Sequence, residues 1–214
     1  LTATEVSIQA AGSGNLLSLQ TTAGALLNVG KVSAGSLGKV SLTSDAGMVM
    51  LDMGAAVVEA GELSVTAKAA VSLLTDVESL ALVVESGDAE VTETDDLNLG
   101  AVEMRSGSLS LEVGGNLDVF SAAGLKVADV LSLKTTAGDL VLSSQVGGYG
   151  SNALDKVTIV VGGDLSLDSV VEASDLIDLK ASGSLNSSRF TLKASGTEGS
   201  IALETGESLL FATG

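Results

Sequence analysis

The chain has 214 residues and a net charge of −17, from 27 acidic and 10 basic residues. It contains no Cys, His, Trp or Pro, which excludes disulfides, thiolate chemistry and the side chain most used in neutral acid–base catalysis and transition-metal binding. The acidity disfavours nucleic acids and anionic lipids as partners. No apolar run approaches the roughly 20 residues of a membrane-spanning helix, so we expect no membrane span.

Short apolar–x–apolar triplets recur along the whole chain, and the middle residue is usually polar. Such alternation predicts short strands with one buried face. In chain order, the expected strands are centred on Val6–Ile8, Leu17–Leu19, Leu27–Val29, Val40–Leu42, Val49–Leu51, Leu63–Val65, Val71–Leu73, Leu80–Leu82, Ala89–Val91, Leu97–Leu99, Leu109–Leu111, Leu117–Val119, Leu131–Leu133, Leu140–Leu142, Val157–Ile159, Leu165–Leu167, Ile177–Leu179, Phe190–Leu192 and Ile201–Leu203.

Turn signals separate these strands. Ala-Gly pairs end the predicted turns Thr22–Gly24, Ser33–Gly35, Asp45–Gly47 and Glu59–Gly61, where glycine is expected to supply a positive φ angle. The segment 145–155 breaks the rhythm and holds the only tyrosine, Tyr149, so it is predicted to be a loop bulging from one coil.

One phrase keeps returning: glycine, a polar residue, then an apolar–x–apolar triplet. Its clearest copies are Gly61–Val65, Gly107–Leu111, Gly115–Val119, Gly138–Leu142 and Gly163–Leu167. Recurrence of one small unit is typical of a repeat protein. Because Asn-Gly and Asp-Gly hairpin signals and a helical period are both absent, the pattern predicts strands that stack coil on coil.

The predicted fold is therefore all-β: a right-handed parallel β-helix, or β-solenoid, of about ten coils of about 21 residues. Residues 1–214 are expected to form a single domain that is a segment or stacking protomer of a larger assembly. The buried stack should include the ten apolar residues Leu109, Leu111, Leu117, Val119, Leu140, Leu142, Leu165, Leu167, Ile177 and Leu179.

The pattern resembles the filamentous-haemagglutinin-like repeats of large secreted bacterial adhesins. Residues 107–119, 137–142 and 162–179 carry the likeness best, through Gly-x-Leu-x-Leu phrases and Ala-Gly turns. The resemblance implies a right-handed β-helix at a cell surface that serves as stalk, adhesin or fibre, with host or surface glycans as further possible partners. It transfers no site residues.

A carbohydrate-active β-helix enzyme, of the polysaccharide lyase or hydrolase type, is the alternative. Paired carboxylates can run glycoside hydrolysis, and acids are abundant here. Sugar-stacking aromatics are scarce, however, with one Tyr and three Phe, and the arginines are only Arg105 and Arg189. We therefore expect no enzyme activity and assign no catalytic, cofactor-binding or metal-binding residue.

Calcium is the one cofactor that the sequence brings into question. Nine acids and no Lys or Arg occur from Asp76 to Glu103, and several oxygens are what Ca²⁺ requires. They are Asp76, Glu78, Glu85, Asp88, Glu90, Glu93, Asp95, Asp96 and Glu103. The favoured interpretation is a solvated acidic face, with Ca²⁺ binding as the alternative.

The first and last triplets, Val6–Ile8 and Leu209–Phe211, read as ordinary core phrases. Exposed strand edges pair with other strands unless they are blocked. We therefore expect the ends to meet neighbouring repeats or further copies of the chain. The predicted function is a structural or adhesive segment of a secreted bacterial surface or fibre protein, extracellular and able to polymerise end to end.

Overall fold

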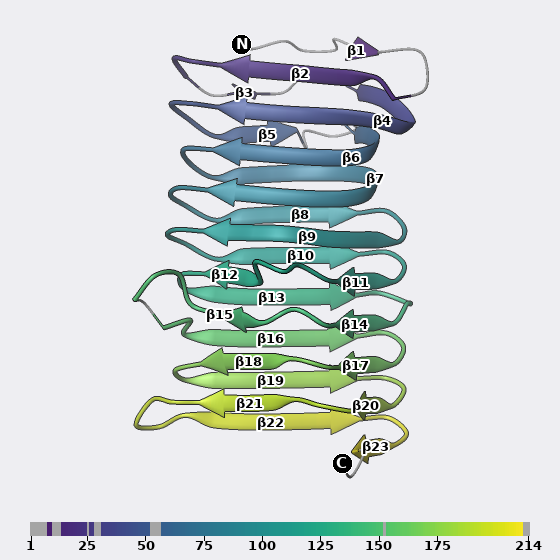
Figure 1. Ribbon diagram of the computed structural model, residues 1–214, viewed down its shortest axis with the longest axis vertical. Helices are drawn as coiled ribbons and strands as arrows, with labels where there is room; N and C mark the ends of the chain where they lie inside the picture. The colour runs from purple at the N-terminus through teal and green to yellow at the C-terminus, as the bar shows by residue number, and fades with distance from the viewer. Residues whose placement is uncertain are drawn as a thin grey trace.

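The structure is a computed structural model that describes residues 8–9, 14–24, 26–27, 31–51, 57–151 and 153–211. These residues are all-β and stack as a parallel β-solenoid of about 8 turns, with no helix among them (Figure 1). The N-terminal and C-terminal strands lie at opposite ends of the stack. The predicted parallel β-solenoid is confirmed, while its right-handed winding stays a prediction.

The strands belong to one continuous sheet. They are β1 (Ile8–Gln9), β2 (Leu16–Thr21), β3 (Leu26–Leu27), β4 (Val32–Ser44), β5 (Val49–Leu51), β6 (Val57–Ala67), β7 (Val71–Val84), β8 (Ala89–Glu93), β9 (Leu97–Met104), β10 (Leu109–Val113), β11 (Leu117–Val119), β12 (Leu125–Val127), β13 (Val130–Thr135), β14 (Leu140–Leu142), β15 (Val146–Gly147), β16 (Lys156–Val161), β17 (Leu165–Leu167), β18 (Val170–Ala173), β19 (Leu176–Ala181), β20 (Leu185–Ser187), β21 (Thr191–Ala194), β22 (Ser200–Thr205) and β23 (Leu209–Phe211).

Each coil has two long sides, and each strand pairs in parallel with its counterpart one coil on. One side stacks β8, β10, β13, β16, β19 and β22. The other side stacks β2, β4, β6, β7 and β9. After β9, two short strands replace the one long strand of each coil, first β11 and β12 and last β20 and β21.

The coils are uneven in length, which corrects the expected ten coils of about 21 residues. Val71 pairs with Ala89, 18 residues on, whereas Leu131 pairs with Val157, 26 residues on. The longer coil contains the segment between β15 and β16, so a loop does hold Tyr149, but it begins later than the predicted 145–155 because Val146–Gly147 form β15. Part of the first predicted triplets, Val6–Ile8 and Leu27–Val29, lies outside the described residues.

The interior is a stack of branched apolar side chains. All ten residues predicted to be buried are at most 2 % exposed. They form columns through the register of the sheet, so that Leu97, Leu117, Leu140, Leu165 and Leu185 lie one above another in successive coils. Burial of aliphatic side chains at about 25 cal/mol per Å² therefore stabilises each coil only through its neighbours.

The glycine of the recurring phrase has two different roles. Gly107 has a φ of 91°, as predicted for a corner glycine. Gly138 and Gly163 do not have a positive φ, and there the requirement is space. A Cβ on Gly163 would lie 2.2 Å from Oδ1 of Asp139, and one on Gly138 would lie 2.3 Å from the backbone of Gly115.

The polar residue directly before the strand triplet bonds one coil to the next. Oδ1 of Asp96 accepts from the backbone N–H of Asn116 at 2.7 Å, and Oδ1 of Asn116 accepts from that of Asp139 at 2.9 Å. Oδ1 of Asp139 accepts from Asp164 at 2.8 Å, and Asp164 from Ser184 at 2.7 Å. This Asp/Asn ladder satisfies corner N–H groups that the strand pairing leaves over, which explains why the phrase recurs.

Two of the predicted turns are strands. Ser33–Gly35 lies within β4 and Glu59–Gly61 within β6, because these long strands curve around the corner without a break. β7, with 14 residues, does the same. From β8 onwards the chain turns at that corner between separate strands. The corner geometry therefore changes between β7 and β8.

The stacked core makes a sharp prediction for neighbouring residues of β14. Leu140→Asp should lower the free energy of unfolding by about 4 kcal/mol or more, because its charge would be buried without a partner. The control is Val141→Asp, since Val141 is exposed on the outer face of the same strand and should change stability by less than about 1 kcal/mol. Thermal or denaturant melts measure both. Equal effects would contradict the assigned faces.

Candidate functional site

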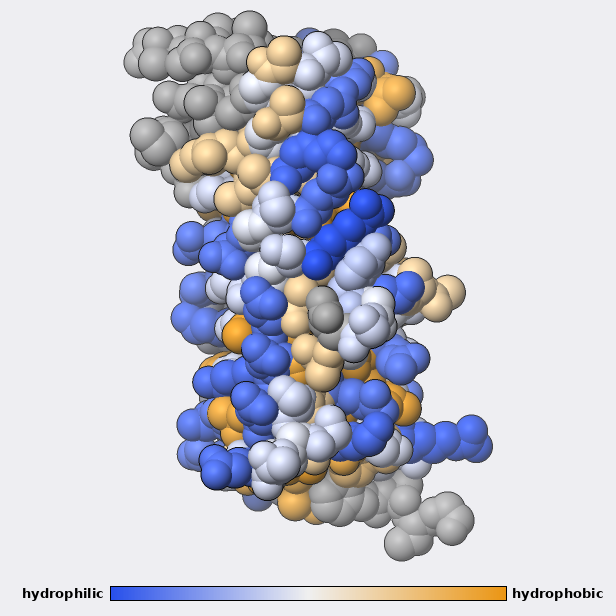
Figure 2. Space-filling view, turned by 90° about the vertical axis from the view of Figure 1, so that its left-hand side faces the viewer, coloured by the Kyte–Doolittle hydropathy of each residue, from blue (hydrophilic) through white to orange (hydrophobic). Residues whose placement is uncertain are grey.

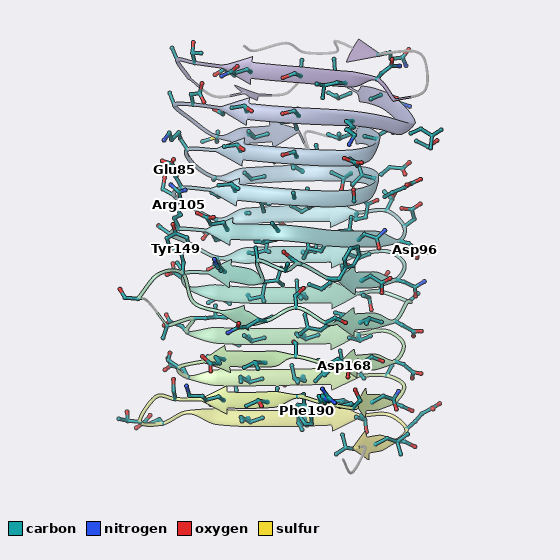
Figure 3. The ribbon with its side chains drawn as sticks, in the orientation of Figure 1. Glu85, Asp96, Arg105, Tyr149, Asp168 and Phe190 are labelled. Carbon is teal, nitrogen blue, oxygen red and sulfur yellow. The ribbon has the colours of Figure 1, made fainter. Side chains whose placement is uncertain are left out.

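An acidic corner lies where β6 and β7 curve around the solenoid and where β8 turns into β9. It encloses a cavity of about 300 Å³. The cavity is lined by Ser36, Glu59, Ala60, Asp76, Val77, Glu78, Asp95 and Asp96. Figure 3 shows Asp96 at this edge, across the solenoid from Glu85, Arg105 and Tyr149. Five carboxylates thus surround one hollow.

Glu93 lies behind this corner and is 1 % exposed. It is the last residue of β8 and shares the inward face of that strand with Ala89 and Val91. Its Oε1 accepts from the backbone N–H of Thr94 at 2.8 Å, and its Oε2 from that of Val77 at 3.1 Å. Both carboxylate oxygens therefore have backbone donors.

The position of Glu93 matches the change in corner geometry. In β7 the backbone continues through Val77, but in the next coil the corresponding strand has ended at Glu93. A continuing strand would have supplied a carbonyl to the N–H of Val77. The side chain of Glu93 supplies the acceptor instead, and a buried N–H group without one would cost about 1–3 kcal/mol.

Burial dominates the protonation of Glu93 and raises its pKa from 4.5 to about 7. Hydrogen bonds from the Thr75 hydroxyl and from backbone N–H groups oppose this shift. The folded protein therefore holds a proton on Glu93 over a pH range in which the unfolded chain has released it. It follows that stability falls as pH rises from about 4.5 to about 7.

We predict that Glu93→Gln flattens this pH dependence. The shift from 4.5 to about 7 corresponds to a loss of up to about 3 kcal/mol in the wild type at neutral pH, whereas a glutamine does not titrate. Melting temperatures of both proteins between pH 5 and pH 8 test this. Glu90→Gln, on the exposed face of the same strand, is the control and should follow the wild type. Parallel curves for wild type and Glu93→Gln would contradict the shifted pKa.

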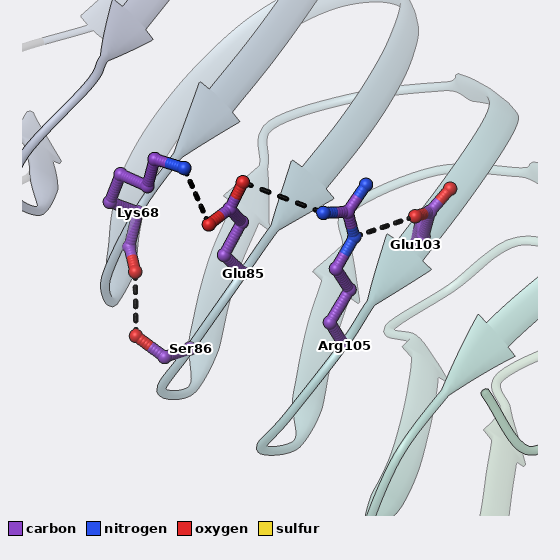
Figure 4. A network of polar contacts seen from close by, with 5 residues as sticks. All are labelled: Lys68, Glu85, Ser86, Glu103 and Arg105. Atoms are coloured by element: carbon purple, nitrogen blue, oxygen red, sulfur yellow. Dashed lines mark hydrogen bonds and ion pairs between the residues drawn. The ribbon is translucent and has the colours of Figure 1, made fainter. Parts of the chain in front are cut away.

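The other edge of the solenoid carries a chain of ion pairs (Figure 4). Nζ of Lys68 lies 2.6 Å from Glu85, and the Arg105 guanidinium lies 3.5 Å from Glu85 and 2.8 Å from Glu103. Arg105 also lies 6.0 Å from the ring centroid of Tyr149, which belongs to the loop between β15 and β16. The hydrogen bond from Arg105 lowers the pKa of Glu103.

These contacts link successive coils at the surface. Figure 2 faces this edge and shows hydrophilic residues along much of it. Because the partners are substantially exposed, each pair contributes little to stability. The Arg105–Tyr149 contact places the loop between β15 and β16 beside the coil that holds Arg105.

The acidic stretch predicted from the sequence is therefore divided. Asp76, Glu78, Asp95 and Asp96 gather at the acidic corner, while Glu85 and Glu103 belong to the opposite edge. Oδ1 of Asp88 accepts from the backbone N–H of Ser108 at 2.9 Å, and Glu90 is exposed.

Carboxylate oxygens of Asp76, Glu93 and Asp95 lie within 4.8 Å of one another. Asp76 and Asp95 are exposed, whereas both oxygens of Glu93 already accept backbone hydrogen bonds. The cluster by itself does not make a cation site, and the acids of the stretch do not form one face, because they lie at two edges of the solenoid.

We expect millimolar Ca²⁺ and a chelator to leave the melting temperature of the protein unchanged, because Asp76 and Asp95 are exposed and burial disfavours the charged, metal-binding form of Glu93. Mg²⁺ at the same ionic strength is the control for screening of the charge of −17. A rise in melting temperature with Ca²⁺ alone would show binding, by mass action.

Sequence reasoning grouped Glu93 with the exposed acids. The signal that separates it was present, because the alternation Ala89, Val91, Glu93 places it on the inward face. The closeness of Asp76 to Asp95 depends on the path of the curved strand β7, which the sequence pattern does not show.

No protein-family model matches the chain, and no curated protein or solved structure shows significant similarity to it. Within the part of the chain that the structure describes, there is no helix long and apolar enough to cross a membrane.

Proposed function

We propose that this protein is a structural or adhesive segment of a secreted bacterial surface or fibre protein, related in design to filamentous-haemagglutinin-like repeats. One observation carries the proposal: each coil is joined to the next by parallel strand pairing, by stacked apolar columns and by the Asp/Asn ladder. Such a body is a rod that transmits load along its axis and presents long side faces, where surface glycans or host molecules could bind.

In this proposal, a solenoid that acts as a stalk is extended by further coils, supplied by neighbouring repeats or by copies of the chain.

A carbohydrate-active enzyme is the second candidate, and the acidic corner is the observation that favours it. A carboxyl group of raised pKa beside an ionised one is the arrangement that glycosidases use as acid and nucleophile. Here the group of raised pKa, Glu93, is buried and faces backbone donors. It is poorly placed to protonate a sugar, so we favour the structural role.

Localisation tests the proposal directly. An antibody against the segment should label intact cells of the source bacterium, and added protease should release the epitope, while a cytosolic marker stays protected. Labelling only after lysis would overturn the proposal. Release of reducing ends from bacterial or plant polysaccharides, abolished by Asp95→Asn, would establish the enzyme instead.

A further inference from the structure

The strand pairing between two successive coils is interrupted at the acidic corner. Figure 1 shows β6 and β7 curving around this edge of the solenoid, whereas β8 reaches β9 through a separate turn. The register between β6 and β7 continues around the corner. Between β7 and the following coil it stops where Thr75 lies beside Glu93, and it resumes where Ser79 lies beside Asn98. In the described sheet, residues 76–78 therefore lack a strand partner in the following coil.

The hydrogen bonds across this gap include one to a titratable side chain. The backbone N–H of Thr94 donates to the Thr75 carbonyl at 3.1 Å, and that of Val77 donates to Oε2 of Glu93 at 3.1 Å. At the next corner, the N–H of Gly114 donates to the backbone carbonyl of Glu93 at 2.9 Å. Closure of the corner between β7 and β8 therefore depends on the Glu93 side chain, whereas main-chain groups join the next two coils.

The charged groups around Glu93 are predominantly acidic. Carboxylate oxygens of Asp76, in β7, and of Asp95, in the turn after β8, lie within 4.8 Å of its own. On the side of β10, its partner in the register is Val113, which is apolar. The other charged residues of the corner are Glu59, Glu78, Asp96 and Lys31, which is paired with Glu59. Loss of the proton from Glu93 thus brings three carboxylates together beside a base that already has a partner.

Ionisation of Glu93 opposes closure of this corner for two reasons. Burial disfavours its charged form, and repulsion from the carboxylates of Asp76 and Asp95 has the same effect. Both effects are relieved if the corner moves apart and water reaches the Glu93 carboxylate. Because the coils of a solenoid contact only their neighbours, such an opening leaves coils further along in place.

We propose that the corner formed by residues 75–78 and 93–96 is a pH-dependent latch. It is closed while Glu93 carries a proton, and it opens locally when Glu93 is ionised, while the coils on either side stay stacked. The transition falls near neutral pH, because the pKa of Glu93 in the closed corner is about 7. Such a latch gives the solenoid a defined place, between β7 and β8, that loosens before the rest of the fold.

Amide hydrogen exchange of the whole chain, followed by NMR, tests the latch. Rates are converted to protection factors, which removes the pH dependence of exchange from an unstructured amide. Between pH 5.5 and pH 8, protection of the Val77 amide should fall about tenfold or more, as expected for a carboxyl group whose pKa drops from about 7 to 4.5 on opening. Protection of the Ile159 amide, in β16, should stay within about threefold, since the C-terminal coils can open without Glu93.

Two variants identify the titrating group. Glu93→Gln should make protection of the Val77 amide independent of pH, because a glutamine does not titrate. Glu90→Gln, on the exposed face of the same strand, is the matched control and should follow the wild type. A ¹³C titration of the Glu93 carboxyl in the wild type gives a further measurement that does not require the Glu93→Gln variant to fold, and its midpoint should lie near pH 7.

Three results would overturn the latch. The first is protection of the Val77 amide that does not change with pH. The second is a fall of the same factor at Val77 and Ile159, because ionisation would then weaken the whole fold rather than one corner. The third is a midpoint of the Glu93 titration near pH 4.5, the ordinary value for a glutamate.

Discussion

The packing of the core and of the corners depends on the spacing of about 4.8 Å between one coil and the next, which parallel strand pairing imposes. Side chains in equivalent positions must lie on top of one another at that distance. Branched aliphatic residues do so well, which is why Leu, Val and Ile fill the interior. Gly138 and Gly163 follow from the same constraint, because a Cβ there would collide with the coil above.

The spacing also decides how polar groups are used. Short Asp and Asn side chains at the corner reach the backbone of the following coil and no further, so they form a ladder of hydrogen bonds. Where the corner changes from a curved strand to a turn, no ladder side chain accepts from the backbone N–H of Val77. The buried carboxylate of Glu93 accepts that hydrogen bond instead. The pKa of Glu93 is raised because this acceptor position is buried, and burial disfavours the charged form of the carboxyl group.

The strand triplets and the inward face could be predicted from the sequence because alternation reports directly on burial. Leu109, Leu140 and Ile177 were assigned to the core on that ground alone, correctly. The number of coils could not be predicted, because the number of residues between strands varies and only the register of the sheet shows which triplets pair. Glycine was misjudged at Gly61, where a positive φ was expected but the requirement is space beside the Ser36 carbonyl, since sequence alone does not tell a left-handed φ from a close contact.

The sequence predicted which acidic residues occur near the candidate site, but it did not predict how they are arranged in space. Nine acids close together in the sequence suggested one acidic surface. Each coil runs from one edge of the solenoid to the other, however, so acids of the same coil lie on opposite edges. Asp96 and Arg105 are nine residues apart and lie on different edges. Glu93 is buried because it is the last inward-facing residue of β8. Asp95 is exposed because it lies in the turn that follows, where the alternation of the strand has ended.

The Asp/Asn ladder has a direction. Every acceptor side chain belongs to one coil and every donor N–H to the coil that follows, from Asp96 through Asn116 and Asp139 to Asp164. Loss of the Asp139 carboxylate would thus leave the N–H of Asp164 without its acceptor, while Asn116 still accepts from the N–H of Asp139. The backbone hydrogen bonds of the same corner run both ways between coils, since the N–H of Leu140 donates to the Asp164 carbonyl and that of Gly163 to the Gly138 carbonyl, so the side-chain ladder alone has a direction.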